Sequence, residues 1–490
     1  MVYTPAPIKF GTDGWRGVIA AEFTFERASQ VAAISAQVLA EEFGGNGREN
    51  RIIVGYDRRF MAEQFALLVA QTLQELGFEV WLSECYAPTP AFSWAAHQEN
   101  ALGALVLTAS HNPANYLGLK VKGAFGGSVG GDITAKIEAQ LKNPLPPAQE
   151  GGSLKYFDPW PSYCQGLQAK VDVEPIRSAI QQGKLRVFAD VMHGAAASGL
   201  QRLLGCPIDE INGDRDPLFG GGSPEPLPKY VPKLLAALKT AAEAVGPELR
   251  VGLIFDGDAD RIAAVDGQGN FLSSQGLIPI LIYHLATQKG LTGEIVKTVS
   301  GSDLIPKLAE LYGIPLTETA IGYKYIADRM LTSPVLIGGE ESGGIGYGGH
   351  IPERDALLSA LYVLETVVQS QQDISEQYGR LQEKVGFVSQ YDRIDLPLAS
   401  MDVRTALVQT LNENPLREIA GEKVTDLLTT DGYKFRMAGG GWLLIRFSGT
   451  EPLLRLYCEA PTSSRVQTVL HWAKDWANAV TPAKPAQSSH

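Results

Sequence analysis

Residues 101–113, ALGALVLTASHNP, join an uncharged apolar run to an abrupt polar turn. The run from 101 to 107 predicts a strand that is buried on both faces, because it has no charged side chain. Pro113 has no N–H with which to continue a strand, so the chain must leave the sheet there. The hydroxyl of Ser110 is therefore expected at the carboxyl end of a core strand, where ligands bind in open α/β sheets. A serine in this position suits a nucleophile or a phosphate acceptor, although an ordinary loop cap has the same composition.

Three aspartates alternate with small residues in the stretch FDGDADR, residues 255–261. Asp256, Asp258 and Asp260 can converge on one centre, and their mutual repulsion makes that arrangement costly unless a cation lies among them. Hard oxygen ligands of this kind suit Mg²⁺. An exposed acidic turn or a Ca²⁺ loop is the alternative, but neither explains the adjacent Arg261 or the missing downstream glutamate of an EF-hand.

Two glycine-containing loops carry groups that bind phosphate or sugar. The loop RFSGTEP, residues 446–452, supplies a guanidinium fork, two hydroxyls and backbone N–H groups, which together fit a phosphate. Its candidate ligands are Arg446, Ser448, Gly449 and Thr450. In GGEESGG, residues 338–344, Glu340 and Ser342 are spaced so that they can hydrogen-bond adjacent hydroxyls of a sugar. A glycine-rich surface turn would have the same composition.

Helical and strand patterns alternate along the first 385 residues. Residues 27–43 and 59–77 predict helices, and residues 51–57 and 79–84 predict strands, which together indicate an α/β sheet covered by helices. Two similar regions follow, and beyond residue 385 the pattern changes to an antiparallel sheet with helices. The sequence thus predicts an α/β protein with three similar mixed-sheet α/β domains and a C-terminal α+β domain. The expected domains are 1–150 with the serine loop, 151–272 with the metal-binding loop, 273–385 with the sugar-binding loop and 386–490 with the phosphate-binding loop.

The composition is that of an ordinary globular protein, with 490 residues, 45% hydrophobic and 20% charged. The net charge of -12 argues against nucleic-acid and membrane-surface partners, because the mean field repels polyanions. An anionic substrate would therefore need a locally basic cleft. The arginines and lysines in or beside the motifs can supply it: Arg16, Lys120, Arg261, Lys324, Arg446 and Arg455.

The cysteines and the N-terminus indicate the compartment. Four cysteines are scattered without pair spacing, which predicts reduced thiols rather than disulfides or a zinc site. The sequence shows neither a secretory signal pattern nor an apolar run near the roughly 20 residues that span a bilayer. A cytoplasmic location is expected.

The motifs TASHNP, DGDADR, GGEESGG and RFSGTEP together resemble the α-D-phosphohexomutases, the phosphoglucomutase and phosphomannomutase superfamily. They occur in the order and at roughly the spacing of that superfamily, and FGTDGWRG near the N-terminus extends the resemblance over nearly the whole chain. Several co-ordered motifs are far more specific than a single one. The resemblance implies domains arranged around a central cleft and an isomerase that acts as an intramolecular phosphotransferase.

The resemblance also implies roles for single residues. Ser110 would carry a phosphoryl group and would hold Mg²⁺ together with Asp256, Asp258 and Asp260. Lys120 falls on the acid/base lysine of the superfamily, and it would act in catalysis with Ser110, Arg261 and Lys324. The implied substrate-binding residues are Arg16, Glu340, Ser342, Arg446, Ser448, Gly449, Thr450 and Arg455.

The favoured hypothesis is a phosphoglucomutase that interconverts glucose 1-phosphate and glucose 6-phosphate. It would use a phosphoserine enzyme, with glucose 1,6-bisphosphate as intermediate and activator. The sequence GYK at 322–324 and the sequence GEES look more like the glucose-preferring branch than the mannose-type relatives. Hexose phosphates are the expected partners, without nucleic acid or membrane, and the expected assembly is a monomer or a homodimer.

Four alternatives use the same motifs. A glucose 1,6-bisphosphate synthase would release the bisphosphate, and a dual-specificity phosphoglucomutase/phosphomannomutase would accept both epimers. A phosphatase would transfer the phosphoryl group to water, which would leave the sugar-binding motif redundant. A non-catalytic sugar-phosphate sensor would not need the nucleophile and the metal cluster together.

Overall fold

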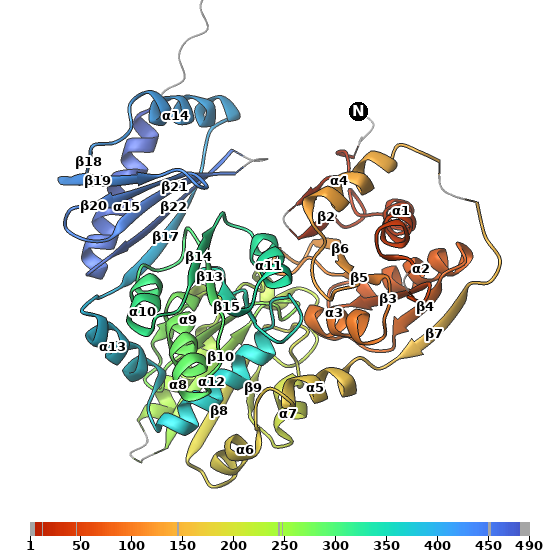
Figure 1. Ribbon diagram of the computed structural model, residues 1–490, viewed down its shortest axis with the longest axis horizontal. Coiled ribbons are helices and arrows are strands. Elements are labelled where there is room, and N and C mark those ends of the chain that lie inside the picture. The colour runs from red at the N-terminus through yellow and green to blue at the C-terminus, as the bar shows by residue number, and fades with distance from the viewer. Residues whose placement is uncertain are drawn as a thin grey trace, which may run out of the picture. The chain divides into compact units, whose positions relative to one another are not determined.

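The computed structural model describes residues 5–11, 13–45, 47–144, 147–243, 246, 248–448 and 452–480. The chain divides into two compact units, and Figure 1 labels their helices and strands. The first comprises Met1–Val296 and Gly322–Tyr378, and the second comprises Lys297–Ile321 and Gly379–His490. Among the described residues, no helix has both the length and the apolar character that crossing a membrane requires. The tail from residue 481 onward lies outside the described residues.

The first unit begins with a seven-stranded mixed sheet in the order β1-β2-β6-β5-β3-β4-β7. β3 pairs in parallel with β4 and β5, and β4 with β7, whereas β6 is antiparallel to both β5 and β2. The strands are β1 (Phe10–Gly11), β2 (Gly14–Val18), β3 (Arg51–Tyr56), β4 (Glu79–Ser83), β5 (Gly103–Leu107), β6 (Tyr116–Gly123) and β7 (Ser153–Phe157). The helices are α1 (Phe25–Phe43), α2 (Ala62–Glu75), α3 (Thr89–Gln98) and α4 (Gly131–Gln140).

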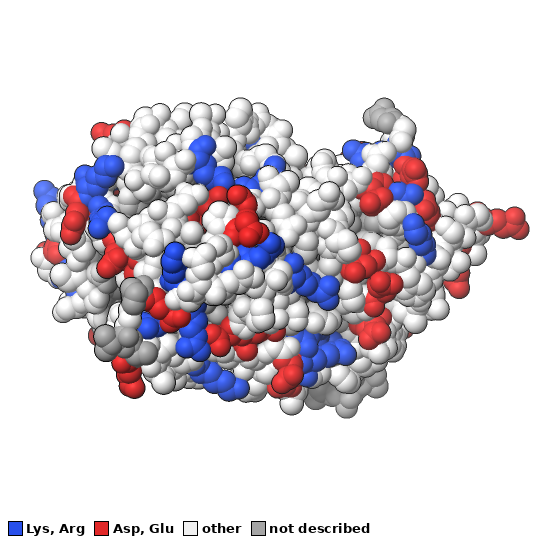
Figure 2. Space-filling view, turned by 90° about the horizontal axis from the view of Figure 1, so that it is seen from below, with Lys and Arg blue, Asp and Glu red and all other residues white. Residues whose placement is uncertain are grey.

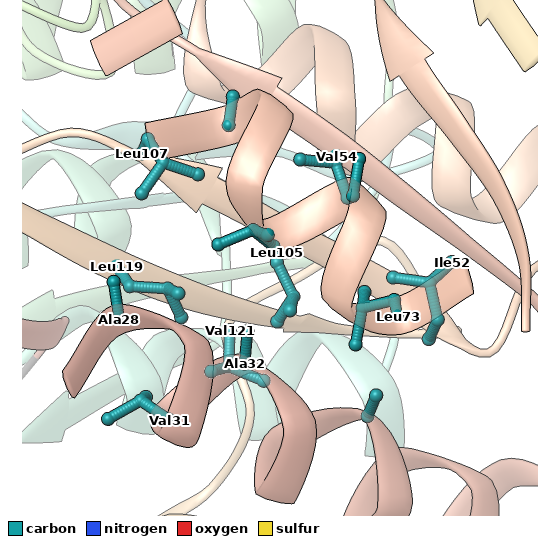
Figure 3. Close-up of a cluster of buried hydrophobic side chains, with 14 of the residues drawn as sticks. Ala28, Val31, Ala32, Ile52, Val54, Leu73, Leu105, Leu107, Leu119 and Val121 are labelled. Atoms are coloured by element: carbon teal, nitrogen blue, oxygen red, sulfur yellow. The ribbon is translucent and has the colours of Figure 1, made fainter. Parts of the chain in front are cut away.

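Helices cover both faces of this sheet. On one face, side chains of α1 and α2 such as Val31 and Leu73 belong to the same buried core as Leu105 of β5 (Figure 3). On the other face α3 packs against β3, where a Cβ at Gly55 would lie 2.4 Å from the ring of Phe92. The strand that leads to Ser110 is therefore buried on both sides, as the sequence predicted.

The second helix begins later than the sequence predicted. A helix was expected from residue 59, but α2 starts at Ala62, because Met61 has a left-handed backbone with φ 59° and Arg59 lies in the preceding turn. Gly77, with φ 85°, ends the helix as expected. The turn between β3 and α2 thus remains outside regular structure and can contact the serine loop.

The second sheet has the order β12-β11-β10-β8-β9 and carries the aspartate cluster. Its strands are β8 (Leu185–Asp190), β9 (Asp209–Ile211), β10 (Leu249–Phe255), β11 (Ile262–Val265) and β12 (Phe271–Leu272). The adjoining helices are α5 (Trp160–Gln168), α6 (Glu174–Gln181), α7 (Gly199–Leu204) and α8 (Pro232–Ala242). β10 and β11 pair antiparallel from Phe255 and Ile262 onward, so the three aspartates occupy the tip of a tight hairpin.

The third sheet has the order β14-β13-β15-β16, and the boundary between the two units lies within β13. Its strands are β13 (Glu294–Thr298), β14 (Leu316–Thr319), β15 (Val335–Gly339) and β16 (Ile345–Tyr347). The helices of this region are α9 (Ser274–Tyr283), α10 (Leu304–Tyr312), α11 (Tyr323–Thr332), α12 (Ala356–Ser370) and α13 (Ile374–Val385). β15 and β16 pair antiparallel, which places residues 340–344 at the tip of a second hairpin.

The fourth sheet is antiparallel, in the order β17-β22-β21-β20-β19-β18, and lies in the second unit. Its strands are β17 (Gln390–Pro397), β18 (Glu418–Ile419), β19 (Glu422–Leu428), β20 (Tyr433–Met437), β21 (Trp442–Phe447) and β22 (Leu453–Ala460). Two helices, α14 (Met401–Glu413) and α15 (Ser463–Ala479), share its apolar core. Three mixed α/β sheets followed by this domain confirm the predicted fold class, whereas the predicted domain boundaries stay predictions.

A buried carboxylate holds α10 to the fourth sheet. Glu459 of β22 accepts hydrogen bonds from the hydroxyl of Ser302, the backbone N–H of Asp303 at 2.8 Å and the indole N–H of Trp442 at 2.8 Å. The ammonium of Lys434 donates to the backbone oxygen of Val299 at 2.8 Å. These bonds explain why residues 297–321 belong to the second unit although the fourth sheet begins much later in the chain.

Charged side chains on the surface are mixed in sign. On the face shown in Figure 2, lysines and arginines are interspersed with aspartates and glutamates. That face therefore offers a polyanion no continuous basic surface, in line with the net charge of -12.

Candidate active site

Ser110 lies where the serine loop meets the aspartate hairpin. Its backbone is left-handed, with φ 50°, and its side chain is buried. The hydroxyl donates to Oδ2 of Asp256 at 2.9 Å, and the backbone N–H donates to the hydroxyl of Thr108 at 2.9 Å. Nδ1 of His111 lies 3.4 Å from the Ser110 hydroxyl. Strands β5 and β10 thus bring together two motifs that lie far apart in the sequence.

The three aspartates are fully buried, and one carboxylate oxygen of each lies within 4.8 Å of the other two. Burial and the neighbouring carboxylates of Asp260 and Asp258 raise the pKa of Asp256 well above its usual value. Oδ1 of Asp258 and Oδ1 of Asp260 have no hydrogen-bond partner within the described parts of the chain. Buried, unpartnered oxygens of this kind fit a hard divalent cation, so the residues are suited to hold a metal.

Lys120 is a cation in direct contact with this group. It lies on β6, and its ammonium is 2.8 Å from Asp258, 2.7 Å from Asp260 and 2.5 Å from Asp13. Burial alone would lower the pKa of Lys120, but the three carboxylates outweigh burial and raise it. The side chain is therefore an ammonium that neutralises part of the acidic cluster.

Arg354 connects three of the motifs, and the sequence analysis did not identify it. Its guanidinium donates to Oδ2 of Asp260 at 2.7 Å and to Asp13, and it lies 3.8 Å from Oε2 of Glu340. Asp13 stays ionised, because burial raises its pKa less than Lys120, Lys122 and Arg354 lower it. Arg354 lies just before α12, between acidic residues. No sequence pattern there distinguishes a buried, functional arginine from a solvated one.

Arg16 and Arg261 add positive charge around the serine. Nη1 of Arg16 donates to the side-chain oxygen of Asn112 at 2.6 Å, and Nε of Arg261 lies 3.8 Å from Asp260. Burial and these two arginines hold the pKa of His111 well below its usual value, so this imidazole is neutral. The N-terminal motif and the serine loop are thus in direct contact.

The sugar-loop candidates lie beside the metal hairpin. The backbone N–H of Ile262 donates to the oxygen of Gly343 at 3.0 Å, and Arg261 forms an isolated β-bridge with Gly344. Oε1 of Glu340 accepts from the backbone N–H of Gly322 at 3.1 Å. Burial raises the pKa of Glu340 to about 7, although Arg354 partly opposes this effect. Ser342 is partly exposed at the tip of this loop.

Lys324 lies at the edge of this arrangement rather than in the carboxylate cluster. It lines a pocket of about 130 Å³ together with Asp13, Ser128, Gly131 of α4 and strand residues of the first sheet. Its ammonium lies 4.9 Å from the centre of the Tyr325 ring. Lys120 contacts Asp13 directly, whereas Lys324 lines the same pocket as Asp13.

The phosphate-loop candidates belong to the second unit. Nε of Arg446 donates to Oδ2 of Asp431 at 3.0 Å, and Arg446 is paired with Arg455 across β21 and β22. The backbone N–H of Ser448 donates to the oxygen of Leu453 at 2.9 Å. Gly449 and Thr450 lie outside the described residues. Two guanidinium groups therefore lie on adjacent strands, each beside an aspartate: Arg446 beside Asp431, and Arg455 at 4.0 Å from Asp395.

Comparison with known families gives a consistent result along the chain. The models of the phosphoglucomutase/phosphomannomutase α/β/α domains I, II and III match residues 7–146, 161–269 and 273–385. The model of the C-terminal domain of the same family matches residues 407–472. The chain belongs to the phosphoglucomutase/phosphomannomutase family.

Individual members of this family are similar over most of their length. A phosphoglucomutase/phosphomannomutase from Thermococcus kodakarensis is 30% identical, covering 94% of this chain and 96% of the relative. A phosphoglucosamine/phosphogalactosamine mutase from Sulfurisphaera tokodaii is also 30% identical, covering 92% and 95%. The crystal structure of a provisionally named phosphomannomutase from Thermus thermophilus has a TM-score of 0.82 and 33% identity, covering 97% of this chain and 100% of that one.

Membership makes this phosphoglucomutase/phosphomannomutase family protein a phosphohexomutase, that is, an isomerase acting on hexose phosphates. The predicted enzyme class is confirmed. This result contradicts the alternative hypothesis of a non-catalytic sensor. The relatives carry names for different sugars, so the family assignment is coarser than the predicted glucose specificity.

Proposed function

We propose that this phosphohexomutase is a phosphoglucomutase that interconverts glucose 1-phosphate and glucose 6-phosphate through a phosphoserine at Ser110. The observation that carries the proposal is the 2.9 Å hydrogen bond from the Ser110 hydroxyl to Asp256, beside two buried carboxylates with unpartnered oxygens. A phosphoryl group on Ser110 would extend from this hydroxyl toward groups that can bear its charge.

Mg²⁺ would be held by Asp256, Asp258, Asp260 and an oxygen of the phosphorylated Ser110. When bound, the ion would neutralise charge on the transferring phosphoryl group. The buried, unpartnered oxygens of Asp258 and Asp260 support this assignment. The hydrogen bonds from the N–H groups of Asp260 and Arg261 to Oδ1 of Asp256 keep the hairpin in the shape that aims these oxygens together.

Lys120 is the candidate for proton transfer. A sugar hydroxyl attacks the phosphorus, the P–O bond to Ser110 breaks, and the hydroxyl proton is finally carried to the serine oxygen. The raised pKa of Lys120 supports the ammonium form, which can protonate the leaving serine oxygen and, once neutral, can take the proton of the attacking sugar hydroxyl, so that each transfer leaves Lys120 an ammonium again. Arg261 and Lys324 would balance the charge of the substrate phosphates.

Substrate binding would draw on the remaining candidates. Glu340 and Ser342 would hydrogen-bond the sugar hydroxyls, and Arg16 would contact phosphate near the serine. The far phosphate would be bound by Arg446, Ser448, Gly449, Thr450 and Arg455. Glucose 1,6-bisphosphate would turn end for end between two transfers, so positions 1 and 6 of the hexose would reach Ser110 alternately.

Two short sequences in the sugar-binding region bear on the preferred sugar. GEES at residues 339–342 and GYK at residues 322–324 support glucose, because they look like the glucose-preferring branch. The name of the Sulfurisphaera tokodaii relative makes glucosamine phosphate a second candidate, and the Thermococcus kodakarensis relative keeps mannose phosphate as a third. A carboxylate and a hydroxyl can bind the hydroxyls of all three sugars.

One assay separates these candidates. The protein is incubated with Mg²⁺ and the 1-phosphate of glucose, mannose or glucosamine, with and without catalytic glucose 1,6-bisphosphate, and all phosphorus species are followed by ³¹P NMR. The proposal expects the 6-phosphate of glucose to form fastest and to require only trace bisphosphate. Accumulation of free bisphosphate in proportion to donor, without isomerisation, would indicate a bisphosphate synthase, and release of inorganic phosphate would indicate a phosphatase.

A cytoplasmic location remains part of the proposal. The cysteines Cys85, Cys164, Cys206 and Cys458 are free thiols, which supports a reducing compartment. The predicted choice between a monomer and a homodimer stays open to a measurement of mass in solution.

A further inference from the structure

One buried arginine, Arg59, donates hydrogen bonds to the backbone of the serine loop, the turn that carries Ser110. Nη2 of Arg59 donates to the backbone oxygens of Ser110 at 2.6 Å and Asn112 at 2.7 Å. Nη1 donates to the backbone oxygens of Pro113 at 2.9 Å and Tyr116 at 3.1 Å. The side chain of Arg59 is fully buried, so these carbonyl groups, rather than water, occupy the donors of its two Nη atoms.

Asp57, two residues earlier, holds the other side of the same loop. Its Oδ2 accepts from the hydroxyl of Thr108 at 2.6 Å, and Thr108 in turn accepts from the backbone N–H of Ser110 at 2.9 Å. Asp57 also lies 3.4 Å from Nε of Arg59 and accepts from the backbone N–H of Arg59 at 2.9 Å. The turn after β3 therefore fixes both the N–H and the C=O of Ser110.

This support matters because Ser110 has an unfavourable backbone. A left-handed conformation costs a residue other than glycine about 1 kcal/mol or more, and it persists only where surrounding contacts impose it. Burying an ion pair is costly as well, and hydrophobic residues of similar size would often stabilise a core better. Arg59 is a buried cation whose Nη donors all bind the loop that carries Ser110. Its presence is thus better explained by a need to fix the geometry of that loop than by a gain in stability.

We propose that Arg59, oriented by Asp57, is the positioning residue that aims the Ser110 hydroxyl at the aspartate hairpin. The inference rests on the proposed function, in which Ser110 carries the phosphoryl group. Arg59 is buried beneath the loop and contacts its backbone. Its charge also acts on Asp258 and Asp256, but Arg59→Lys keeps that charge, so the substitution tests the hydrogen bonds to the loop. Lysine cannot replace it, because an ammonium offers three donors from one point, whereas the guanidinium reaches four separated oxygens in a plane.

The test compares Arg59→Lys with Arg51→Lys. Arg51 is a buried arginine at the opposite end of β3, where it pairs with Glu79 and contacts the Trp81 ring, so it is matched in burial and charge but remote from the loop. We expect Arg59→Lys to lower kcat about 100-fold, since small misplacements of a reacting group cost about that factor, with KM unchanged. Arg51→Lys should lower Tm and leave kcat unchanged.

A second readout follows the serine itself. Each variant is mixed with glucose 1,6-bisphosphate, and the rate of phosphoserine formation is measured by intact mass. The rate should fall with kcat in Arg59→Lys and stay normal in Arg51→Lys. If Arg59→Lys keeps wild-type kcat and a wild-type phosphorylation rate, the inference is wrong, whatever happens to Tm.

Two further variants keep the result interpretable. If Arg59→Lys does not fold, the isosteric Asp57→Asn decides, because it keeps the volume and removes the charge that orients Arg59. A folded Asp57→Asn with unchanged kcat would overturn the inference, and a lowered kcat at constant KM would support it. Ser110→Ala distinguishes failure of the proposed function from failure of the positioning role. An active Ser110→Ala variant refutes the proposed function. An inactive Ser110→Ala variant together with a fully active Arg59→Lys variant refutes the positioning role alone.

Discussion

The hydroxyl of Ser110 donates a 2.9 Å hydrogen bond to Asp256, which is 146 residues away in the chain. The contact joins the carboxyl ends of two strands from different sheets, β5 and β10. Because both partners are buried, neither can turn to solvent without disturbing the loop that carries it. A phosphoryl acceptor and a metal-binding carboxylate are thus within reach of each other before any ligand is present.

Replacing Ser110 by alanine should abolish turnover. The variant lacks the proposed phosphoryl carrier, so kcat should fall at least about 1,000-fold while the fold persists. Mutase activity and intact mass after incubation with glucose 1,6-bisphosphate measure this. The matched control is Ser35→Ala, which removes another buried hydroxyl, on α1, and should keep full activity. Phosphorylated protein recovered from Ser110→Ala would place the carrier elsewhere.

Removing divalent metal should stop the reaction reversibly. Chelation should lower kcat more than about 100-fold, because the buried carboxylates would then leave the phosphoryl charge unbalanced, and added Mg²⁺ should restore it. Asp258→Asn should bind metal more weakly in calorimetry and lose comparable activity. Asp266→Asn, a buried aspartate at the opposite end of the β10–β11 hairpin, should change neither quantity. Full activity in metal-free Asp258→Asn would contradict the assignment.

Glu340 should impose an acid limb on the pH profile. Its pKa is raised to about 7, so below that pH the carboxyl is protonated and loses acceptor capacity for sugar hydroxyls. The value of kcat/KM should therefore rise with pH through about 7 and level off above it. The substrate phosphate also titrates in this range, so Glu340→Gln is the reference. An identical acid limb in that variant would show that another group is responsible.

Lys434 should make the second unit more stable at alkaline pH. Burial, followed by the charge of Lys297, lowers its pKa to about 8, whereas in the unfolded chain the lysine has its ordinary pKa of 10.5. Between these values the unfolded state binds more protons, so the free energy of unfolding should rise with pH there and fall as pH drops through 8. The full effect is about 3 kcal/mol.

Urea unfolding at pH 8 and pH 10 measures this difference. Lys434→Met cannot titrate and should lack the rise, while tyrosines and other groups contribute equally to both proteins. Lys423→Met, which removes an exposed lysine on the neighbouring strand β19, should behave like the wild type. Equal slopes in the wild type and Lys434→Met would mean that Lys434 is not the titrating group.

Local patterns were enough to predict the motif-bearing turns. An apolar run ending in a proline-terminated turn placed Ser110 at the end of a strand, and alternating aspartates predicted a cluster that is indeed buried. Both signals are local, because strand burial and carboxylate repulsion depend on neighbours in the sequence.

Contacts set by tertiary packing were not predictable. Arg354 and Arg59 are surrounded by other charged residues in the sequence, and only the folded chain shows which of them is buried against a loop. The left-handed backbone of Ser110 likewise has no sequence signature, since it is imposed by the turn after β3. The late start of α2 was likewise not predictable, because it follows from the left-handed backbone of Met61.

The bonds between Glu459 and Ser302 limit how this protein can be taken apart. A recombinant fragment beginning near residue 386 would lack the Ser302 hydroxyl and the Asp303 N–H, and would leave that buried carboxylate with the donors of Ser389 and Trp442 alone. Chimeras that exchange the last domain between relatives would meet the same obstacle unless residues 297–321 were exchanged with it. Insertions and deletions during evolution should accordingly be rare both in residues 297–321 and around Glu459.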